Sequence, residues 1–209
     1  MKTLLILPPL LIENRYNEYS SAAGTSPPLG LGYIAAVLKK NVYQVKIMDG
    51  LVERLALDEI INRIKEYNPD VIGLTVHSIN YNSILKFGIL IKRLNKFIKI
   101  VVGGPHVSAD PLGSIKDSPF DFGVYGEGEY TYLELIKALE KNKKLNNING
   151  LIYKKNNKVI KNLPRAPIEN LDEMPFPARE LFPPLEKYKL SIFYYKKFPV
   201  TTQITSRGC

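Results

Sequence analysis

The 209-residue sequence predicts an α/β protein with a doubly wound, flavodoxin-like sheet of five parallel strands. Short apolar runs alternate along the chain with longer segments whose apolar residues recur at helical spacing. Some of the runs are apolar throughout, which is typical of strands covered on both faces. Glycine, proline and asparagine residues separate the segments. We therefore expect a Rossmann-like domain, followed by a C-terminal hairpin and a proline-rich connector.

The first part of this domain is expected to hold three strands and two helices. In chain order we expect a strand at 2–7, a helix beginning at Pro28, a strand at 44–48, a helix at 58–67 and a strand at 71–76. Proline suits the start of a helix because the first backbone N–H groups there have no helical partner. Asp58 can cap the second helix, and Asn68-Pro69 closes it.

The second part is expected to continue the alternation. We expect a helix at 83–95, strands at 98–102 and 122–125, and a helix at 130–141. Two runs around Asn156-Asn157 then predict a hairpin. Residues 163–199 are rich in proline, which neither a helix nor a central strand tolerates, so we interpret them as a connector.

Composition excludes several classes of protein. No apolar run reaches the roughly 18 residues of a membrane span, and the short apolar start ends at Pro8-Pro9 without a signal-peptide cleavage site. The net charge of +9 comes from scattered lysines rather than one basic block, so no nucleic-acid partner is expected. The single cysteine, Cys209, excludes a disulfide framework. We expect a cytoplasmic protein that binds neither nucleic acid nor membranes.

Unusual residues cluster after the predicted strands, where doubly wound folds bind their ligands. Two glycine pairs, Gly103-Gly104 and Gly126 with Gly128, would let bare main chain approach a large flat cofactor. A tight turn explains the first pair equally well, and a strand-to-helix turn with acids at a helix start explains the second. Glu127 and Glu129 disfavour phosphate binding there.

Three other polar residues follow predicted strands. His77 and His106 are more simply hydrogen-bonded loop residues than metal ligands. Asp49 stands where dinucleotide-binding folds place a ribose-binding acid, but no glycine fingerprint follows the first strand, which leaves capping or solvation as its simplest role.

Taken in order, these motifs resemble one family. The resemblance rests on Pro27-Pro28-Leu29-Gly30-Leu31, Asp49, Pro69-Asp70-Val71-Ile72-Gly73, Gly103-Gly104-Pro105-His106, Gly126-Glu127-Gly128-Glu129, Ile148-Asn149-Gly150-Leu151, Leu171-Asp172-Glu173-Met174-Pro175-Phe176-Pro177 and Thr205-Ser206-Arg207-Gly208-Cys209. Together they resemble the amino-terminal half of cobalamin-dependent radical SAM enzymes, over essentially the whole chain.

The resemblance implies cobalamin as the cofactor. It divides the chain into a cobalamin-binding domain at 1–144, a hairpin and connector at 145–198 and the first strand of a radical SAM domain at 199–209. It implies base-off binding without a protein histidine, because the loop after the first strand has none. The residues taken as candidate cofactor contacts are Pro9, Asp49, Thr75, His77, Ser78, Gly103, Gly104, Pro105, His106, Gly126, Glu127, Gly128 and Glu129.

The resemblance also implies a metal role for Cys209, as the first of three cysteines that hold a [4Fe–4S] cluster to which S-adenosylmethionine binds. One thiolate cannot hold such a cluster, so the chain alone is expected to be inactive, whereas the intact enzyme would be a methyltransferase or perform related radical chemistry. Two alternatives stay open from the sequence. One is a stand-alone cobalamin carrier, and the other is a flavodoxin-like module for a nucleotide or flavin.

Overall fold

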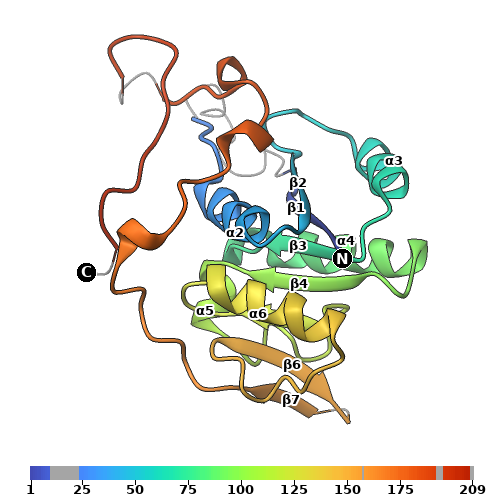
Figure 1. The fold of residues 1–209 in the computed structure, drawn as a ribbon. Coiled ribbons are helices and arrows are strands. Elements are labelled where there is room, and N and C mark those ends of the chain that lie inside the picture. The colour runs from blue at the N-terminus through green and yellow to red at the C-terminus, as the bar shows by residue number, and fades with distance from the viewer. Residues whose placement is uncertain (10–23, 157, 192–194, 208–209) are drawn as a thin grey trace.

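A computed structural model describes residues 1–9, 24–156, 158–191 and 195–207. Within these ranges seven strands form one sheet in the order β2-β1-β3-β4-β5-β6-β7 (Figure 1). The strands are β1 (Lys2–Leu7), β2 (Gln44–Asp49), β3 (Val71–Thr75), β4 (Lys99–Gly103), β5 (Phe122–Val124), β6 (Leu151–Lys155) and β7 (Lys158–Lys161). The first five are parallel, which confirms the predicted fold class and strand order.

Helices cover both faces of the sheet. The helices are α2 (Leu29–Lys40), α3 (Leu57–Tyr67), α4 (Tyr81–Leu94), α5 (Pro105–Ala109) and α6 (Glu129–Glu140), with short 3₁₀ turns at Ser78–Asn80, Leu171–Glu173, Arg179–Leu181 and Leu185–Lys187. Helices α2 and α6 pack on one face, and α3 and α4 pack on the other. Side chains of β1 alternate between the faces: Leu4 and Ile6 point toward α3 and α4, and Leu5 points toward α2 and α6.

Local chemistry explains where the helices begin and end. Helix α2 starts directly after Pro28, and α3 ends where Asn68 takes a left-handed conformation with φ 48° before Pro69. The short α5 was not predicted, because five residues carry too little apolar periodicity to indicate a helix. Among the described residues, no helix combines the length and the apolar character that crossing a membrane requires.

The predicted hairpin extends the sheet instead of forming a separate unit. Strand β6 pairs antiparallel with β5, and β7 pairs antiparallel with β6. The chain reaches this position through Gly150, whose φ of 80° suits glycine and whose missing side chain leaves room for Thr131. The sheet therefore runs across the predicted boundary between residues 144 and 145.

The connector folds back over the domain. Figure 1 shows the orange-to-red segment leaving β7, passing the start of α6 and continuing over α2. Ala178 donates its backbone N–H to the carbonyl of Gly32 at 3.0 Å, and Lys39 forms an ion pair with Glu180. Residues 195–207 adopt neither helix nor strand, so the predicted strand from residue 199 stays a prediction about a longer chain.

Candidate functional site

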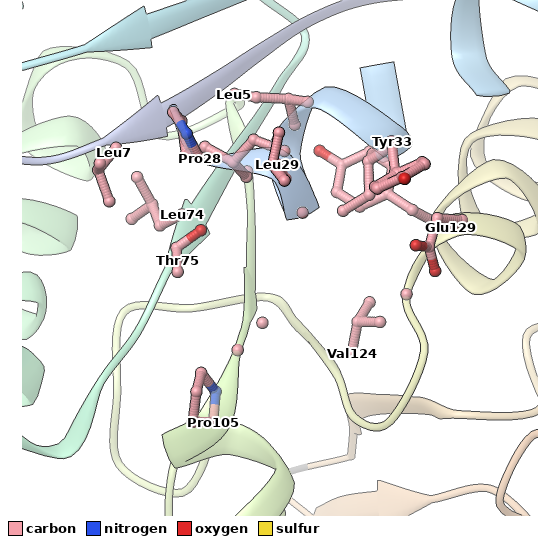
Figure 2. A pocket seen from close by; sticks show the side chains of 18 of the residues that line it. Leu5, Leu7, Pro28, Leu29, Tyr33, Leu74, Thr75, Pro105, Val124 and Glu129 are labelled. Atoms are coloured by element: carbon pink, nitrogen blue, oxygen red, sulfur yellow. The ribbon is translucent and has the colours of Figure 1, made fainter. Parts of the chain in front are cut away.

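A cavity of about 710 Å³ opens at the carboxyl edge of the sheet, beside the starts of α2 and α6. It lies at the ends of β1, β3, β4 and β5, and so includes the point between β1 and β3 where the strand order reverses. Figure 2 shows Pro28 and Leu29 on one side of this space, Thr75 and Val124 on strands, and Pro105 opposite. Reversal points of this kind are the usual ligand sites of open α/β sheets.

Two cross-strand rows form the floor of the cavity, and each contains a glycine. Leu5, Gly73 and Val101 are register neighbours in one row. Thr75, Gly103 and Val124 are neighbours in the next row toward the carboxyl edge. The space over Gly73 is filled by Leu5 and Tyr132, whereas a Cβ on Gly103 would lie no closer than 3.5 Å to Val124, so the missing side chain leaves room only in the outer row.

The glycine turns that the sequence singled out have two different physical causes. Gly104 has a φ of 104°, and a Cβ there would lie 2.8 Å from the carbonyl oxygen of Val76, so packing within the protein already requires glycine. Gly126 has a φ of 73°, and a Cβ there would meet no atom within 4 Å. The Cα of Gly126 is thus open at this rim, while its backbone N–H already donates to Ser108 Oγ at 3.1 Å.

The two acidic residues of the second turn pair with the C-terminal segment. The guanidinium of Arg207 lies 2.7 Å from Glu129 Oε1 and 3.5 Å from Glu127 Oε1, and it stacks over the ring of Tyr33 at 4.7 Å. Glu127 also accepts the backbone N–H of Ile168 at 2.6 Å. Both carboxylates line the cavity and at the same time hold the connector and the following segment against it.

The structure separates the two histidines. His77 lines the cavity, and its backbone N–H donates to the side chain of Asn80 at 2.8 Å. His106, on α5, does not line it; its Nδ1 lies 3.1 Å from Ser78 Oγ, and its ring packs on Tyr81 with centroids 4.3 Å apart. In the part of the chain that the structure describes, no group of three histidine, cysteine or acidic side chains could hold a metal ion.

Asp49 lies beside the cavity without lining it. Its carboxyl group is 1% exposed and accepts the hydroxyl of Tyr188 at 3.0 Å and the backbone N–H of Val52 at 3.0 Å. Burial raises the pKa of Asp49 more than these hydrogen bonds lower it, and the nearby Glu53 raises it further. In this arrangement Asp49 anchors the connector at the end of β2.

The predicted cofactor contacts fall into two groups, those that line the cavity and those that do not. Those lining the cavity are Thr75, His77, Gly103, Gly104, Pro105, Gly126, Glu127, Gly128 and Glu129, whereas Pro9, Asp49, Ser78 and His106 do not line it. Cys209 lies outside the described residues. Their roles as cofactor contacts stay predictions.

Many residues that line the cavity were not among the predicted contacts, and three of them bear on the site: Gly73, Tyr132 and Arg207. Gly73 carried a usable signal, because a glycine inside an apolar strand often marks a close approach of another group. Tyr132 carried none, since a tyrosine on a helix is common in any protein, whereas Arg207 belongs to the terminal motif of the resemblance but was not taken as a cofactor contact.

Comparison with known families and structures agrees with this geometry. Residues 19–136 match the family described as B12 binding domain. The chain belongs to this family. It is a cobalamin-binding domain, and the predicted resemblance to the amino-terminal part of cobalamin-dependent radical SAM enzymes is confirmed.

The relatives are longer proteins. The chain is 39% identical to an uncharacterized methyltransferase of Pyrococcus horikoshii over 100% of its own length and 43% of that protein. It is 28% identical to cytidylyl-2-hydroxyethylphosphonate methyltransferase of Streptomyces wedmorensis, over 87% of this chain and 42% of that protein. The chain thus spans less than half the length of either relative.

A solved structure shares the fold. The cobalamin-dependent S-adenosylmethionine radical enzyme OxsB, solved with aqua-cobalamin bound, superposes with a TM-score of 0.70 at 26% identity. The match covers 85% of this chain and 24% of OxsB.

Proposed function

We propose that this domain holds cobalamin base-off in the cavity at the carboxyl edge of the sheet, without a histidine of the protein on cobalt. The observation that carries the proposal is the cavity itself, which opens at the reversal point of the sheet and is lined by glycine turns and apolar side chains. The position of His106 supports the absence of a histidine ligand on cobalt, because His106 lies outside the cavity and pairs with Ser78.

The residues present fit such a group. A volume of about 710 Å³ falls within the range of roughly 300–1,000 Å³ typical of sites for drug-sized molecules, and cobalamin is larger, so the cavity would enclose only part of it. Main chain open at Gly126 and the carboxylates of Glu127 and Glu129 offer a polar rim to amide side chains, and the floor offers an apolar surface to a ring system.

Within an intact enzyme, this domain would serve methyl transfer or a related radical reaction, as the names of the methyltransferase relatives suggest. Cobalamin supplies a cobalt centre that can accept and pass on a methyl group. The residues of this chain bind it, keep water from the apolar floor and hold the following segment near it.

The domain division belongs to the same proposal: a cobalamin-binding domain at 1–144, a hairpin and proline-rich connector at 145–198 and the start of a radical SAM domain at 199–209. The contact of Arg207 with Glu129 at the cavity rim supports it, because Arg207 stands two residues before Cys209 in the chain. In this proposal Cys209 is a cluster ligand, and the chain alone is not catalytic.

The test is to add hydroxocobalamin to the purified chain, remove unbound cofactor and record the visible spectrum. We expect a retained base-off spectrum that is the same in the native chain and in the variants His77→Ala and His106→Ala. A chain that retains no corrinoid, or that shows a flavin spectrum instead, would refute the proposal. An imidazole-ligated spectrum that either variant loses would refute the ligation part alone.

The coding sequence downstream of Cys209 distinguishes an enzyme from a carrier. A continuation that supplies two more cysteines in the spacing Cys-x-x-x-Cys-x-x-Cys, counted from Cys209, supports the enzyme. A stop codon after Cys209 supports a stand-alone carrier.

A further inference from the structure

The charged side chains of the cavity meet at one point of its rim. Among the described residues that line the cavity, Glu127 and Glu129 are the only acids, and Arg207 is the only lysine or arginine. Glu129 is 6% exposed and begins α6, where the helix dipole favours a negative charge. Two partly buried carboxylates that share one guanidinium would repel each other without it. Arg207 therefore completes this part of the rim.

The guanidinium of Arg207 uses both its edge and its face. Its edge meets Glu129 at 2.7 Å and Glu127 at 3.5 Å, and its face lies 4.7 Å from the ring centre of Tyr33. Figure 2 shows Tyr33, from α2, and Glu129, from α6, on the same side of the cavity. A planar guanidinium can make both kinds of contact at once, which a lysine ammonium cannot. The contact thus ties the C-terminal segment to two helices.

A second arginine holds the other end of the same segment. The guanidinium of Arg179 donates to Thr201 Oγ1 at 2.8 Å and to the carbonyl of Thr202 at 2.7 Å. Between the two arginine contacts, Ile204 lines the cavity. Residues 201–207, here called the strap, therefore border the cavity and are held at both ends.

The strap can be released without unfolding the domain. Its backbone belongs to neither a helix nor a strand, and its two anchors are contacts of arginine side chains. Segments fixed by a few such contacts open at a smaller cost in free energy than the strands of a sheet do. Ile204 and Arg207 both line the cavity, so a ligand that passes them has to displace the strap.

We propose that Arg207 is a positioning residue that clamps the strap at the rim, and that opening of this clamp sets the rate at which cobalamin enters and leaves the cavity. Glu127, Glu129 and Tyr33 then act by holding Arg207. The inference rests on the proposed function, because it requires cobalamin in this cavity. It goes further by naming the side chains that control exchange of the cofactor.

The test compares the native chain with Arg207→Met, which keeps an apolar stem and removes the charged fork. Rapid mixing with hydroxocobalamin gives the association rate, and exchange of bound hydroxocobalamin against excess cyanocobalamin gives the dissociation rate. We expect both rates to rise about tenfold, which is the size of a charge-assisted contact, while Kd changes less than about threefold. Raising the salt concentration from about 0.05 M to about 1 M should speed exchange in the native chain but not in Arg207→Met.

Two further variants separate the clamp from a general effect of lost charge. Arg63→Met is the matched control, because Arg63 also pairs with two glutamates, Glu53 at 3.2 Å and Glu59 at 2.9 Å, and does not line the cavity. It should leave both rates unchanged. Arg207→Lys keeps the charge without the planar fork, so its rates should lie between those of the native chain and Arg207→Met and should again depend on salt.

Other outcomes would overturn the proposal. Unchanged rates in Arg207→Met would show that the strap does not limit exchange. Faster dissociation with an unchanged association rate would make Arg207 a contact of the bound cofactor instead of a clamp. Equal acceleration in Arg63→Met would assign the effect to overall charge. Binding of hydroxocobalamin by the native chain tests the proposed function separately: if the native chain binds no corrinoid, that function fails and the clamp with it.

Discussion

The face of the sheet under α3 and α4 and the face under α2 and α6 share the same strands but differ in how completely side chains fill them. On the first, here called the closed face, large side chains such as Ile60, Ile64, Ile84 and Ile91 are at most 1% exposed. On the second, here called the open face, α2 contributes Gly32 and Ala35 and the floor contributes Gly73 and Gly103.

The difference shows how one fold serves stability and binding at once. The closed face buries aliphatic side chains as far as the carboxyl edge of the sheet, and such burial is the main favourable term in folding. The open face uses small residues near its carboxyl edge, where the same packing would fill the cavity. There the connector supplies part of the missing packing: Phe182 and Pro177 would each lie within 3 Å of a Cβ on Gly32. We expect substitutions on the two faces to differ in their effects on stability and on cobalamin binding.

The largest effect is expected on the closed face. Ile91 is fully buried between α4 and the sheet, so Ile91→Ala should lower the free energy of unfolding by about 2–5 kcal/mol. Urea unfolding measures this loss. Cobalamin affinity of the folded fraction should stay unchanged, and a clear fall in that affinity would contradict the separation of the two faces.

A smaller effect, dependent on pH, is expected where the connector joins the open face. The raised pKa of Asp49 means that the folded protein holds this proton to a higher pH than the unfolded chain does. Stability therefore falls as the pH rises from about 4 through the folded pKa and is level above it. Over this pH range, the free energy of unfolding of the native protein should fall, relative to that of Asp49→Asn, by about 1.4 kcal/mol for each unit by which the pKa is raised.

Urea unfolding of both proteins between pH 4 and pH 7 measures this difference. Asp58→Asn is the matched control, because Asp58 occupies an exposed position in the first turn of α3. Parallel stability curves for the native protein and Asp49→Asn would show that the buried carboxyl does not titrate as proposed.

The smallest stability effect is expected at the mouth of the cavity. Gly30 lines the cavity on α2, and a Cβ there would meet no atom within 4 Å. Gly30→Leu should change the free energy of unfolding by no more than about 1 kcal/mol, in the stabilising direction, because glycine is a poor helix former. The added side chain should nevertheless weaken cobalamin binding at least about tenfold.

The control for this variant is Asn62→Leu, which adds a leucine to an exposed position of α3 behind the closed face. It should leave binding unchanged. Similar cobalamin affinities for Gly30→Leu and the native chain would show that the cofactor does not occupy this part of the cavity.

Much of the fold could be predicted because its signals are local. The strand expected at 2–7 is β1, and the helix expected from 83 to 95 is α4, which begins two residues earlier. The pairing of β6 with β5 could not be predicted, since a hairpin pattern does not show whether its outer edge meets another strand.

The site was predictable to a similar extent. The turns at Gly103-Gly104 and Gly126-Glu127-Gly128-Glu129 were found because glycine after a strand is a local signal, and they do line the cavity. The contact partners of these residues could not be predicted. Glu129 meets Arg207 and Asp49 meets Tyr188, and both contacts join parts of the chain that are far apart in sequence.

The sequence by itself determined the alternation of strands and helices and the edge of the sheet where a ligand would bind, and it made the observed order of the parallel strands the simplest choice. Only the tertiary structure decided that Gly104 is required by Val76, that Asp49 holds the connector, and that the hydroxyl of Tyr132 lies over Gly73 with no partner among the described residues. The physical reason is range: periodicity and turn chemistry act between close neighbours in the chain, whereas burial and hydrogen bonding in a site depend on which distant segments the fold brings together.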